Sequence, residues 1–237
     1  MLLVNDVPSS WFNPDDPADL GFEYLETMRT LLDVVRPPPA RIDAVHLGGA
    51  GCTLPRALAA ARPRSRQVVA EVDGELVELA RSVFGLAHVP GLRLRAADGV
   101  AALSATRDDS TDLIVRDAFA GAVVPEPMTT TGFIADVARA LRPDGLYLAN
   151  VADRPPLQLA RAEVATALTA FAHVAVVAES GVLRGRRYAN LVLAASASPL
   201  PVTAWARAVR GGVVPLRLLA GAELAAFAAA ATPIRAV

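Results

Sequence analysis

Glycines and carboxylates follow successive apolar segments of this 237-residue chain, in positions that suit the binding of a nucleoside. The turn Gly48-Gly49-Ala50-Gly51 comes directly after one such segment, and glycines let the backbone approach a ligand closely. About twenty residues further on, Glu71 ends the next segment, where an acidic side chain accepts hydrogen bonds from a ribose diol. Asp98 follows the third segment, where a carboxylate can accept a hydrogen bond from an adenine amine. The sequence therefore predicts that a nucleoside-containing cofactor is bound by Gly48, Gly49, Gly51, Glu71, Asp98 and Gly99.

The predicted cofactor is an S-adenosyl sulfonium compound rather than a dinucleotide. Read as a dinucleotide fingerprint, Gly49-x-Gly51-x-x-Leu54 has leucine at the third position, where a small residue lets the helix pack on the strand. Pro55 and the lack of lysine also argue against pyrophosphate binding. Asp117 ends the fourth apolar segment, at the strand edge where open sheets bind ligands. Carboxylates at successive strand ends suit an S-adenosyl group better than NAD.

Short apolar segments alternate with amphipathic segments whose apolar residues recur at helical spacing. Alternating strands and helices predict an α/β fold: a Rossmann-like, doubly wound, mostly parallel seven-stranded sheet with an antiparallel last strand. The predicted strands are 43–47, 67–72, 92–96, 111–116, 145–151, 174–178 and 188–194. The main predicted helices are 21–35, 53–62, 74–84, 130–141 and 157–171.

Three regions follow from this pattern. Residues 1–36 form an N-terminal lead-in and helix, residues 37–198 the Rossmann-like nucleoside-binding catalytic domain, and residues 199–237 a C-terminal helical tail.

Composition excludes several classes of protein. The chain has 23 basic and 24 acidic residues, which argues against a nucleic-acid partner because such partners require clustered positive charge. One cysteine excludes a disulfide framework, and three scattered histidines argue against a zinc site, so no metal is expected. The start lacks a signal-peptide pattern, and no segment has the apolar length of a membrane span. We expect a cytoplasmic protein with no membrane partner.

Over about residues 1–196, the chain resembles the spermidine synthase family of aminopropyltransferases. The turn from Gly48 to Thr53 resembles the family's Gly-Gly-Gly-Asp-Gly-Gly loop, and Glu71-Val72-Asp73 resembles its Glu-Ile-Asp. Ala97-Asp98-Gly99 resembles the family's Gly-Asp-Gly, and the segment from Asp117 to Gly121 resembles its Asp-Ser-Ser-Asp-Pro gate. The segment from Gly21 to Met28 resembles the family's tyrosine helix. The resemblance implies the class I methyltransferase fold.

The resemblance also implies roles for the matched residues. Glu71 would hold the ribose and Asp98 would contact adenine. Asp117 would activate the acceptor, with Tyr24 as the active-site tyrosine. The segment Ala118–Met128 would form a lid that excludes water.

Three residues of the family pattern are replaced in this chain. The loop aspartate that anchors the donor's amine is Gly51, the second gate aspartate is Ala120, and the His or Gln of the tyrosine helix is Leu25. The family's N-terminal β-domain is reduced to a few residues around 2–10. Because a buried ammonium needs a carboxylate partner, other carboxylates must bind the acceptor, and the candidates are Glu23, Glu126 and Asp153.

The leading hypothesis is a transferase that moves an alkyl group, aminopropyl by resemblance, from an adenosyl sulfonium donor to a small-molecule amine. Asp117, with Tyr24 nearby, would act as base or proton relay. The first alternative is an S-adenosylmethionine-dependent methyltransferase, because loss of the loop aspartate leaves room for the donor's full amino-acid tail. The second is a catalytically silent nucleoside-binding or assembly module. The donor is accordingly decarboxylated S-adenosylmethionine or S-adenosylmethionine. A homodimer is possible, with the apolar tail Leu216–Ala231 as its interface.

Overall fold

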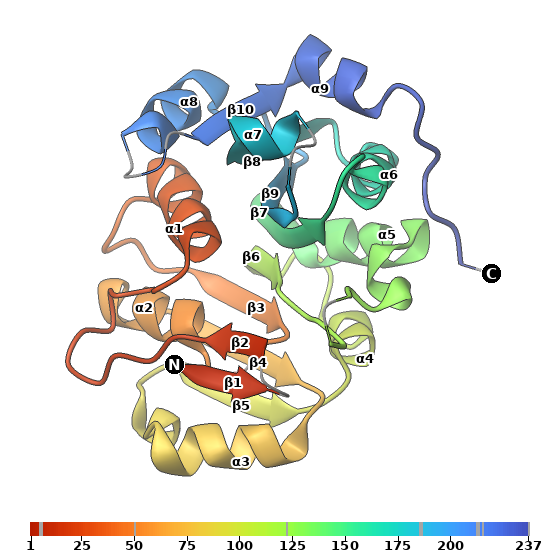
Figure 1. The fold of residues 1–237 in the computed structure, drawn as a ribbon. Coiled ribbons are helices and arrows are strands. Elements are labelled where there is room, and N and C mark those ends of the chain that lie inside the picture. Colours follow the sequence, from red (N-terminus) through yellow and green to blue (C-terminus); the bar gives the residue numbers. More distant parts are fainter. Residues whose placement is uncertain are drawn as a thin grey trace.

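The computed structural model describes residues 1–4, 7–49, 51–121, 123–184, 187–211, 214 and 216–236. Ala50 of the glycine turn lies outside this range. Within the described residues, eight strands form one sheet, and a separate hairpin lies near the N-terminus (Figure 1). The order of the strands across the sheet is β10 (Leu216–Ala220), β8 (His173–Glu179), β9 (Ala189–Ser196), β7 (Leu141–Asp153), β6 (Thr111–Arg116), β3 (Asp43–Leu47), β4 (Arg66–Glu71) and β5 (Leu92–Ala96).

The strands from β7 across to β5 are parallel, and β9 is antiparallel to both of its neighbours, β7 and β8. This is the predicted Rossmann-like α/β fold with an antiparallel last strand. The central parallel strands are buried because helices cover both of their faces, whereas the edge strand β5 alternates leucine with exposed arginine. In β6, for example, every residue from Thr111 to Arg116 is buried.

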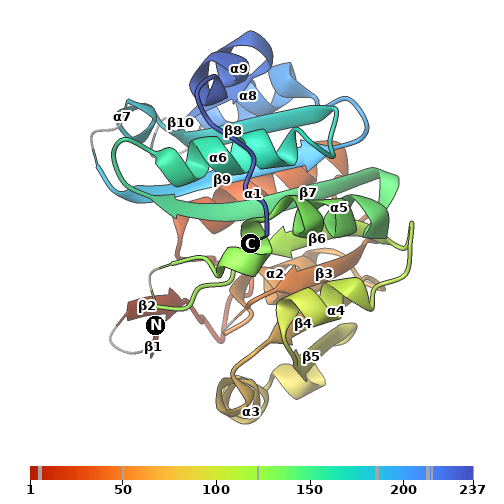
Figure 2. The same ribbon diagram turned by 90° about the vertical axis from the view of Figure 1, so that its right-hand side faces the viewer.

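Helices cover both faces of the sheet. One face packs against α1 (Glu23–Val35), α2 (Thr53–Ala61) and α8 (Val202–Arg210). The other face, which Figure 2 shows toward the viewer, packs against α4 (Gly99–Ser104), α5 (Thr131–Ala140), α6 (Gln158–Ala167) and α9 (Gly221–Ala228). The remaining helices are α3 (Gly74–Val83) beside β5, the single turn α7 (Ser180–Leu183), and the 3₁₀ turns η1 (Leu86–His88) and η2 (Glu126–Thr129).

Polar side chains start several of these helices. Asp73 accepts hydrogen bonds from the backbone N–H groups of Glu75 and Leu76 at the start of α3. Thr130 accepts one from the N–H of Phe133 at the start of α5. Such caps satisfy backbone donors that have no partner within the helix.

The N-terminal hairpin lies against the glycine turn. It consists of β1 (Leu2–Val4) and β2 (Val7–Ser10), which are antiparallel. The Gly51 N–H donates to Ser10 Oγ at 2.9 Å, and Thr53 Oγ1 donates to the Trp11 carbonyl at 2.6 Å. The lead-in of the chain therefore covers the start of α2.

The prediction for the C-terminal region needs two corrections. The sheet has eight strands rather than seven, because β10 lies in the segment expected to be entirely helical and pairs antiparallel with β8. Without β10, the backbone groups of β8 would form an open sheet edge. In addition, Leu219, Leu224 and Phe227 are buried in the chain's own core, so these side chains cannot supply the interface expected of the tail.

Among the described residues, no helix has both the length and the apolar character needed to cross a bilayer.

Candidate active site

Side chains from three distant segments meet at Asp117, which directly follows β6. Tyr24, in the first turn of α1, donates its phenol hydrogen to Asp117 Oδ2, and the two oxygens lie 2.9 Å apart. Asn150, in β7, donates from Nδ2 to Asp117 Oδ1, also at 2.9 Å. The fold positions these groups because β6 and β7 are neighbouring parallel strands and α1, which packs on the sheet, begins at their carboxyl ends (Figure 1). Both oxygens of the carboxylate are thus oriented by neutral donors.

The surroundings of this group favour proton transfer. Burial raises the pKa of Asp117, while the hydrogen bonds from Asn150 and Tyr24 and the charge of Arg116 only partly oppose that effect. Burial and the nearby Asp117 charge raise the pKa of Tyr24 well above its ordinary value, so the phenol stays protonated. Asp117 is therefore a carboxylate with enhanced basicity, next to a phenol that can pass on a proton.

The glycine turn approaches Asp117 so closely that it excludes side chains. Gly48 has a φ of +80°, and a Cβ there would lie 2.4 Å from the Asp117 carbonyl oxygen. The Asp117 N–H also donates to the carbonyl of Leu47 at 2.9 Å. A Cβ on Gly49 would lie 2.6 Å from Val69 Cγ1. Glycine at these two positions therefore places the turn directly beside the candidate base.

The single cysteine follows this turn as the residue before α2. Cys52 is fully buried, and burial together with the Glu71 charge raises the pKa of its thiol to about 12. A thiol in that state is not a nucleophile at neutral pH, which agrees with a packing role.

Glu71 and Asp98 lie at adjacent strand ends. Glu71 ends β4 opposite Ala96 of β5, and Asp98 comes two residues after Ala96. Glu71 Oε2 accepts from the Gly49 N–H and Oε1 from the Asp73 N–H, both at 3.2 Å. Asp98 Oδ1 accepts from the Ala101 N–H at 2.9 Å and so caps α4, while its side chain is exposed. Both carboxylates therefore lie at the carboxyl edge of the sheet.

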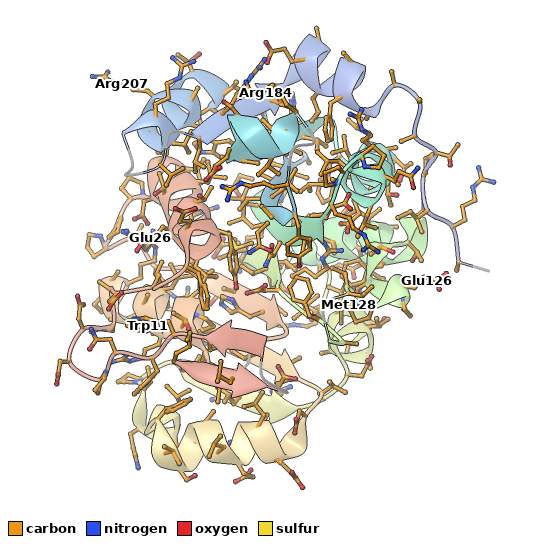
Figure 3. The ribbon with its side chains drawn as sticks, in the orientation of Figure 1. Trp11, Glu26, Glu126, Met128, Arg184 and Arg207 are labelled. Atoms are coloured by element: carbon orange, nitrogen blue, oxygen red, sulfur yellow. The ribbon has the colours of Figure 1, made fainter. Side chains whose placement is uncertain are left out.

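The segment Ala118–Met128 crosses this edge. A Cβ on Gly99 would lie 2.3 Å from Met128 Cε, so the methionine covers Gly99. Phe119 is partly buried against the main core. Figure 3 shows Met128 close to the sheet and Glu126 on the outer side of the molecule. In this arrangement the segment closes over the side where Gly99 lies.

Two cavities share the side chain of Tyr24. The larger, about 330 Å³, is lined by Glu23, Tyr24, Thr27, Glu179, Arg187 and Asn190 over an apolar floor that includes Val177 and Val192. The smaller, about 20 Å³, lies between the glycine turn and Asp117, and Ser9 and Ser10 complete its wall. The small cavity has room for about one water molecule. Neither cavity is lined by Glu71, Asp98 or Gly99.

The whole chain is similar to a solved protein. A probable spermidine synthase from Corynebacterium glutamicum, known from a crystal structure, is 34% identical to it, with a TM-score of 0.90. The similarity covers 98% of this chain and 87% of that one. The chain belongs to the spermidine synthase family.

Other comparisons agree with this family. A polyamine aminopropyltransferase of Chromobacterium violaceum is 30% identical over 149 residues, which is 62% of this chain and 56% of the relative. The chain thus spans about half the length of the curated relatives it matches. Human methyltransferase-like protein 13, solved in complex with SAH, is 20% identical with a TM-score of 0.63, covering 81% of this chain and 94% of that one, and shares the fold. No protein-family model matches the chain.

The structure gives a reason for one departure from the family pattern. A Cβ on Gly51 would lie 2.9 Å from Ser10 Cβ and 3.3 Å from Phe84, so the family's loop aspartate does not fit here. Leu25, at the His or Gln position, is buried in the core beside Tyr24. Ala120 is exposed and pairs with Val123 in an isolated bridge.

The three candidate replacement carboxylates lie in different places. Glu23 lines the larger cavity next to Tyr24. Glu126 is exposed on η2 and lines neither cavity. Asp153 accepts from the N–H groups of Arg154 and Ala160, at 2.7 and 2.9 Å, near the start of α6. Of these three, the structure brings only Glu23 beside the Tyr24–Asp117 pair.

Sequence reasoning missed Asn150. It is a polar residue within the apolar run of β7, close to the carboxyl end of that strand. That interruption, at the edge where Asp117 also lies, was the available signal. Within the described part of the chain, no group of three His, Cys, Asp or Glu side chains is placed to hold a metal ion.

Proposed function

We propose that this protein transfers an aminopropyl group from decarboxylated S-adenosylmethionine to a small-molecule amine. The observation that carries the proposal is the hydrogen bond between Tyr24 and Asp117 beside the glycine turn. It lies at the carboxyl edge of a parallel sheet, where such folds bind ligands. Membership of the spermidine synthase family and the similarity to named polyamine aminopropyltransferases support the same reaction.

Glu71 and Asp98 are the proposed contacts to the donor's nucleoside. Backbone N–H groups on either side orient the two oxygens of Glu71 at the edge of the glycine turn, and a carboxylate has about four lone-pair sites, which suits acceptance from the ribose hydroxyls. The cap that Asp98 makes uses Oδ1, and its side chain is exposed, which suits a contact from Oδ2 to the adenine amine. Because Met128 covers Gly99, donor entry requires Ala118–Met128 to move, and its return would exclude water.

The larger cavity is the proposed acceptor site. Glu23 supplies a carboxylate for an ammonium group, and the apolar floor suits an alkyl chain. Tyr24 forms a wall of this cavity and of the small cavity that Asp117 lines, so an amine bound there lies next to the phenol.

The chemistry needs a deprotonated amine held in line with the reacting carbon. As the amine attacks, the new C–N bond forms and the C–S bond breaks. The bonding electrons go to sulfur, so the sulfonium becomes the thioether of methylthioadenosine. The amine proton passes to Asp117, directly or through Tyr24, whose own hydrogen already points at Oδ2. Burial raises the pKa of Asp117 and so favours this acceptance.

A second candidate function is methyl transfer from S-adenosylmethionine. One observation favours it: the place of the family's loop aspartate is filled by Ser10, whose hydroxyl accepts from the Gly51 N–H. Because S-adenosylmethionine carries a carboxylate beside its amine, a hydroxyl in place of an aspartate removes a charge repulsion that would disfavour this donor.

Calorimetry and turnover together test the proposal. The protein is titrated with decarboxylated S-adenosylmethionine, S-adenosylmethionine and methylthioadenosine, and donors that bind are then incubated with a panel of amines and analysed by mass spectrometry. We expect tight binding of the decarboxylated donor and an acceptor that gains an aminopropyl group. Gain of a methyl group would select the second candidate. Absence of binding by all three compounds would support a silent module and overturn both proposals.

A further inference from the structure

A buried arginine behind the candidate base joins three segments of the site. Arg116 Nη1 donates to the Met128 carbonyl at 3.0 Å, and Nη2 donates to the Asn150 carbonyl at 3.1 Å. Nη2 also lies 2.7 Å from Glu163 Oε2 of α6. The guanidinium therefore links the end of the lid segment to the residue that orients Asp117, and Glu163 holds it there.

Burying this pair is costly. The Arg116 side chain is 1% exposed and that of Glu163 is 6% exposed, so both charges lose nearly all their hydration. The loss of hydration of such a buried pair often outweighs its mutual attraction. Moreover, Arg116 Nε and Glu163 Oε1 have no hydrogen-bond partner among the described residues. The bonds that are made go to the two segments flanking the site.

We propose that Arg116, clamped by Glu163, is a positioning residue that sets the orientation of Asp117 and of the closing segment that ends at Met128. The effect on catalysis rests on the proposed function, whereas the effect on Asp117 itself does not.

The charges around Asp117 make the inference testable. Tyr24 of α1 and Arg116 of β6 both act on the carboxylate, and His46 of β3 lines the same small cavity. Burial lowers the pKa of His46 to about 4, so this ring is neutral at neutral pH. Glu163 of α6 offsets the positive charge of Arg116. If that offset is removed, the cation attracts the Asp117 carboxylate more strongly and the pKa of Asp117 falls.

A second buried arginine provides a matched control. Arg62 is fully buried, pairs with Asp33 of α1, and donates to the Arg36 carbonyl at 2.8 Å. Asp33 is more exposed than Glu163, at 26%, and also pairs with Arg29. Its Nε likewise has no partner among the described residues. Arg62 follows the C-terminal end of α2 and contacts neither Asp117 nor Asn150 through any hydrogen bond in the described structure.

The experiment compares Glu163→Gln with Asp33→Asn. Carbon-13 NMR of labelled aspartate follows the titration of Asp117, whose signal is assigned with Asp117→Asn. We expect Glu163→Gln to lower the pKa of Asp117 by about half a pH unit or more and Asp33→Asn to leave it unchanged. An unchanged Asp117 titration in Glu163→Gln would overturn the proposal. This readout does not depend on turnover, so it remains decisive if no donor proves active.

Arg116→Lys tests whether the planar guanidinium, which contacts two carbonyls and a carboxylate at once, is required. A lysine keeps the charge but cannot reach two carbonyls and a carboxylate in one plane. We expect kcat to fall about 10- to 100-fold while KM for the amine stays near the wild-type value, because Asp117 is misplaced rather than the acceptor site. A melting temperature lowered as much as in Asp33→Asn, with wild-type kcat, would show that Arg116 is only structural.

Discussion

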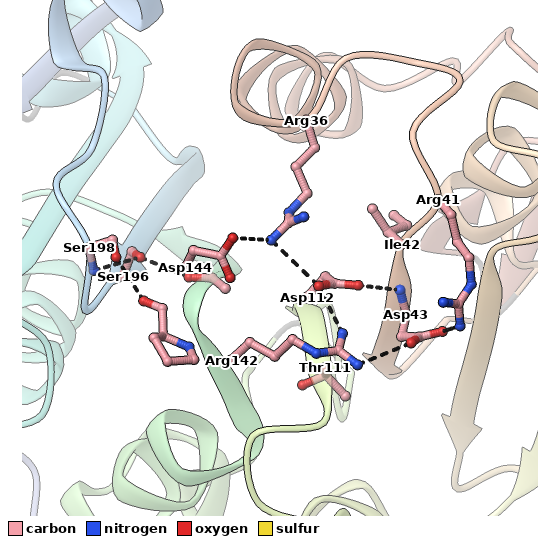
Figure 4. Close-up of polar contacts among 12 residues, drawn as sticks. Arg36, Arg41, Ile42, Asp43, Thr111, Asp112, Arg142, Asp144, Ser196 and Ser198 are labelled. Atoms are coloured by element: carbon pink, nitrogen blue, oxygen red, sulfur yellow. Dashed lines mark hydrogen bonds and ion pairs between the residues drawn. The ribbon is translucent and has the colours of Figure 1, made fainter.

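Carboxylates at the two ends of the parallel strands have different partners. At the amino-terminal ends of β3, β6 and β7, the amino edge of the sheet, aspartates pair with arginines. At the carboxyl-terminal ends of the strands from β7 to β5, the carboxyl edge, the described hydrogen bonds to carboxylates come from neutral donors. Figure 4 shows the first group. Asp112 pairs with Arg36 and Arg142 at 3.5 and 2.8 Å, and Arg142 also pairs with Asp43 at 3.3 Å. Asp144 pairs with Arg36 at 2.7 Å.

The opposite edge has similar carboxylates with different partners. Glu71 and Asp98 accept from backbone N–H groups, and Asp117 accepts from a phenol and an amide. Ion pairs at the amino edge neutralise the aspartates and tie the strand ends to α1. At the carboxyl ends of the strands from β7 to β5, neutral donors orient the carboxylates. Glu179, at the carboxyl end of β8, is an exception because it pairs with Arg187. From β7 to β5, the type of partner, more than the number of acidic residues, therefore distinguishes the amino-terminal strand ends from the carboxyl ends, where we propose that the donor binds.

Asp117→Asn should have the largest effect on activity. It removes the proposed base while an amide can still bond to Tyr24 and Asn150, so turnover should fall about 10²- to 10⁴-fold. Affinity for methylthioadenosine should be unchanged by calorimetry. Wild-type turnover would remove Asp117 from the mechanism.

The same variant should become more stable than the wild type at neutral pH. Because burial raises the pKa of Asp117 above its ordinary value of 3.8, the folded state binds this proton more tightly than the unfolded chain does. The wild type therefore loses stability as pH rises from the ordinary aspartate value through the raised one. The amide of the variant does not titrate, so the variant has no such loss. Melting temperatures of both proteins from pH 3 to 8 should diverge across that window and stay apart above it.

Asp112→Asn tests the amino edge. In contrast to Asp117→Asn, it should lower stability and leave turnover unchanged. It takes one of two carboxylate partners from Arg36 and one from Arg142, at a buried position. Because a hydrogen bond to a charged group contributes about 2 kcal/mol, the free energy of unfolding should fall by about that amount. Turnover measured well below the melting temperature should match the wild type. Urea denaturation gives the first quantity, and a tenfold loss of turnover in the folded variant would contradict the division between the edges.

Glu71→Gln should weaken the binding of the donor. A neutral amide accepts less strongly from ribose hydroxyls than a carboxylate, so the donor's Kd should rise about 10- to 100-fold with little change in kcat. Asp144→Asn, at the exposed end of the amino-edge network, is the matched control and should leave the Kd as it was. Equal Kd values for both variants would remove Glu71 from the donor site.

The parts of this molecule that were predictable from sequence are those whose cause is local. The strands Asp43–Leu47, Leu92–Ala96 and Thr111–Arg116 have the predicted bounds, because each is a short segment with an apolar or alternating pattern between turn signals. β10 was missed because it lies in an alanine-rich region, and only its pairing with β8 reveals it as a strand.

Contacts between segments that are far apart in the sequence were harder to predict. Tyr24 and Asp117 were paired through the family resemblance, since 93 residues separate them. The Arg116–Glu163 pair had no local signal, because α6 reaches β6 only after the chain has formed β7. Glu126 was a candidate for a replacement carboxylate, and the structure leaves it exposed on η2, outside the lining of both cavities.

Tyr24→Phe should produce an intermediate effect. It removes one of the two side-chain hydrogen bonds to Asp117 and the proposed proton relay, so kcat should fall about tenfold. The lost bond had stabilised the charged carboxylate, so the pKa of Asp117 should rise and the acid limb of the kcat/KM profile should move to higher pH. A profile that keeps its wild-type midpoint would mean that the phenol does not govern the charge of Asp117.

Asp98 should show the smallest effects, and two variants separate its two roles. Asn is as good a helix N-cap as Asp, so Asp98→Asn should leave the free energy of unfolding within a few tenths of a kcal/mol, whereas Asp98→Ala should lower it by about 1 kcal/mol. The asparagine variant nevertheless loses the carboxylate, so its Kd for methylthioadenosine should rise about fivefold. If only the alanine variant binds more weakly, Asp98 contributes through the geometry of α4, and this carboxylate belongs with the structural aspartates of the opposite edge.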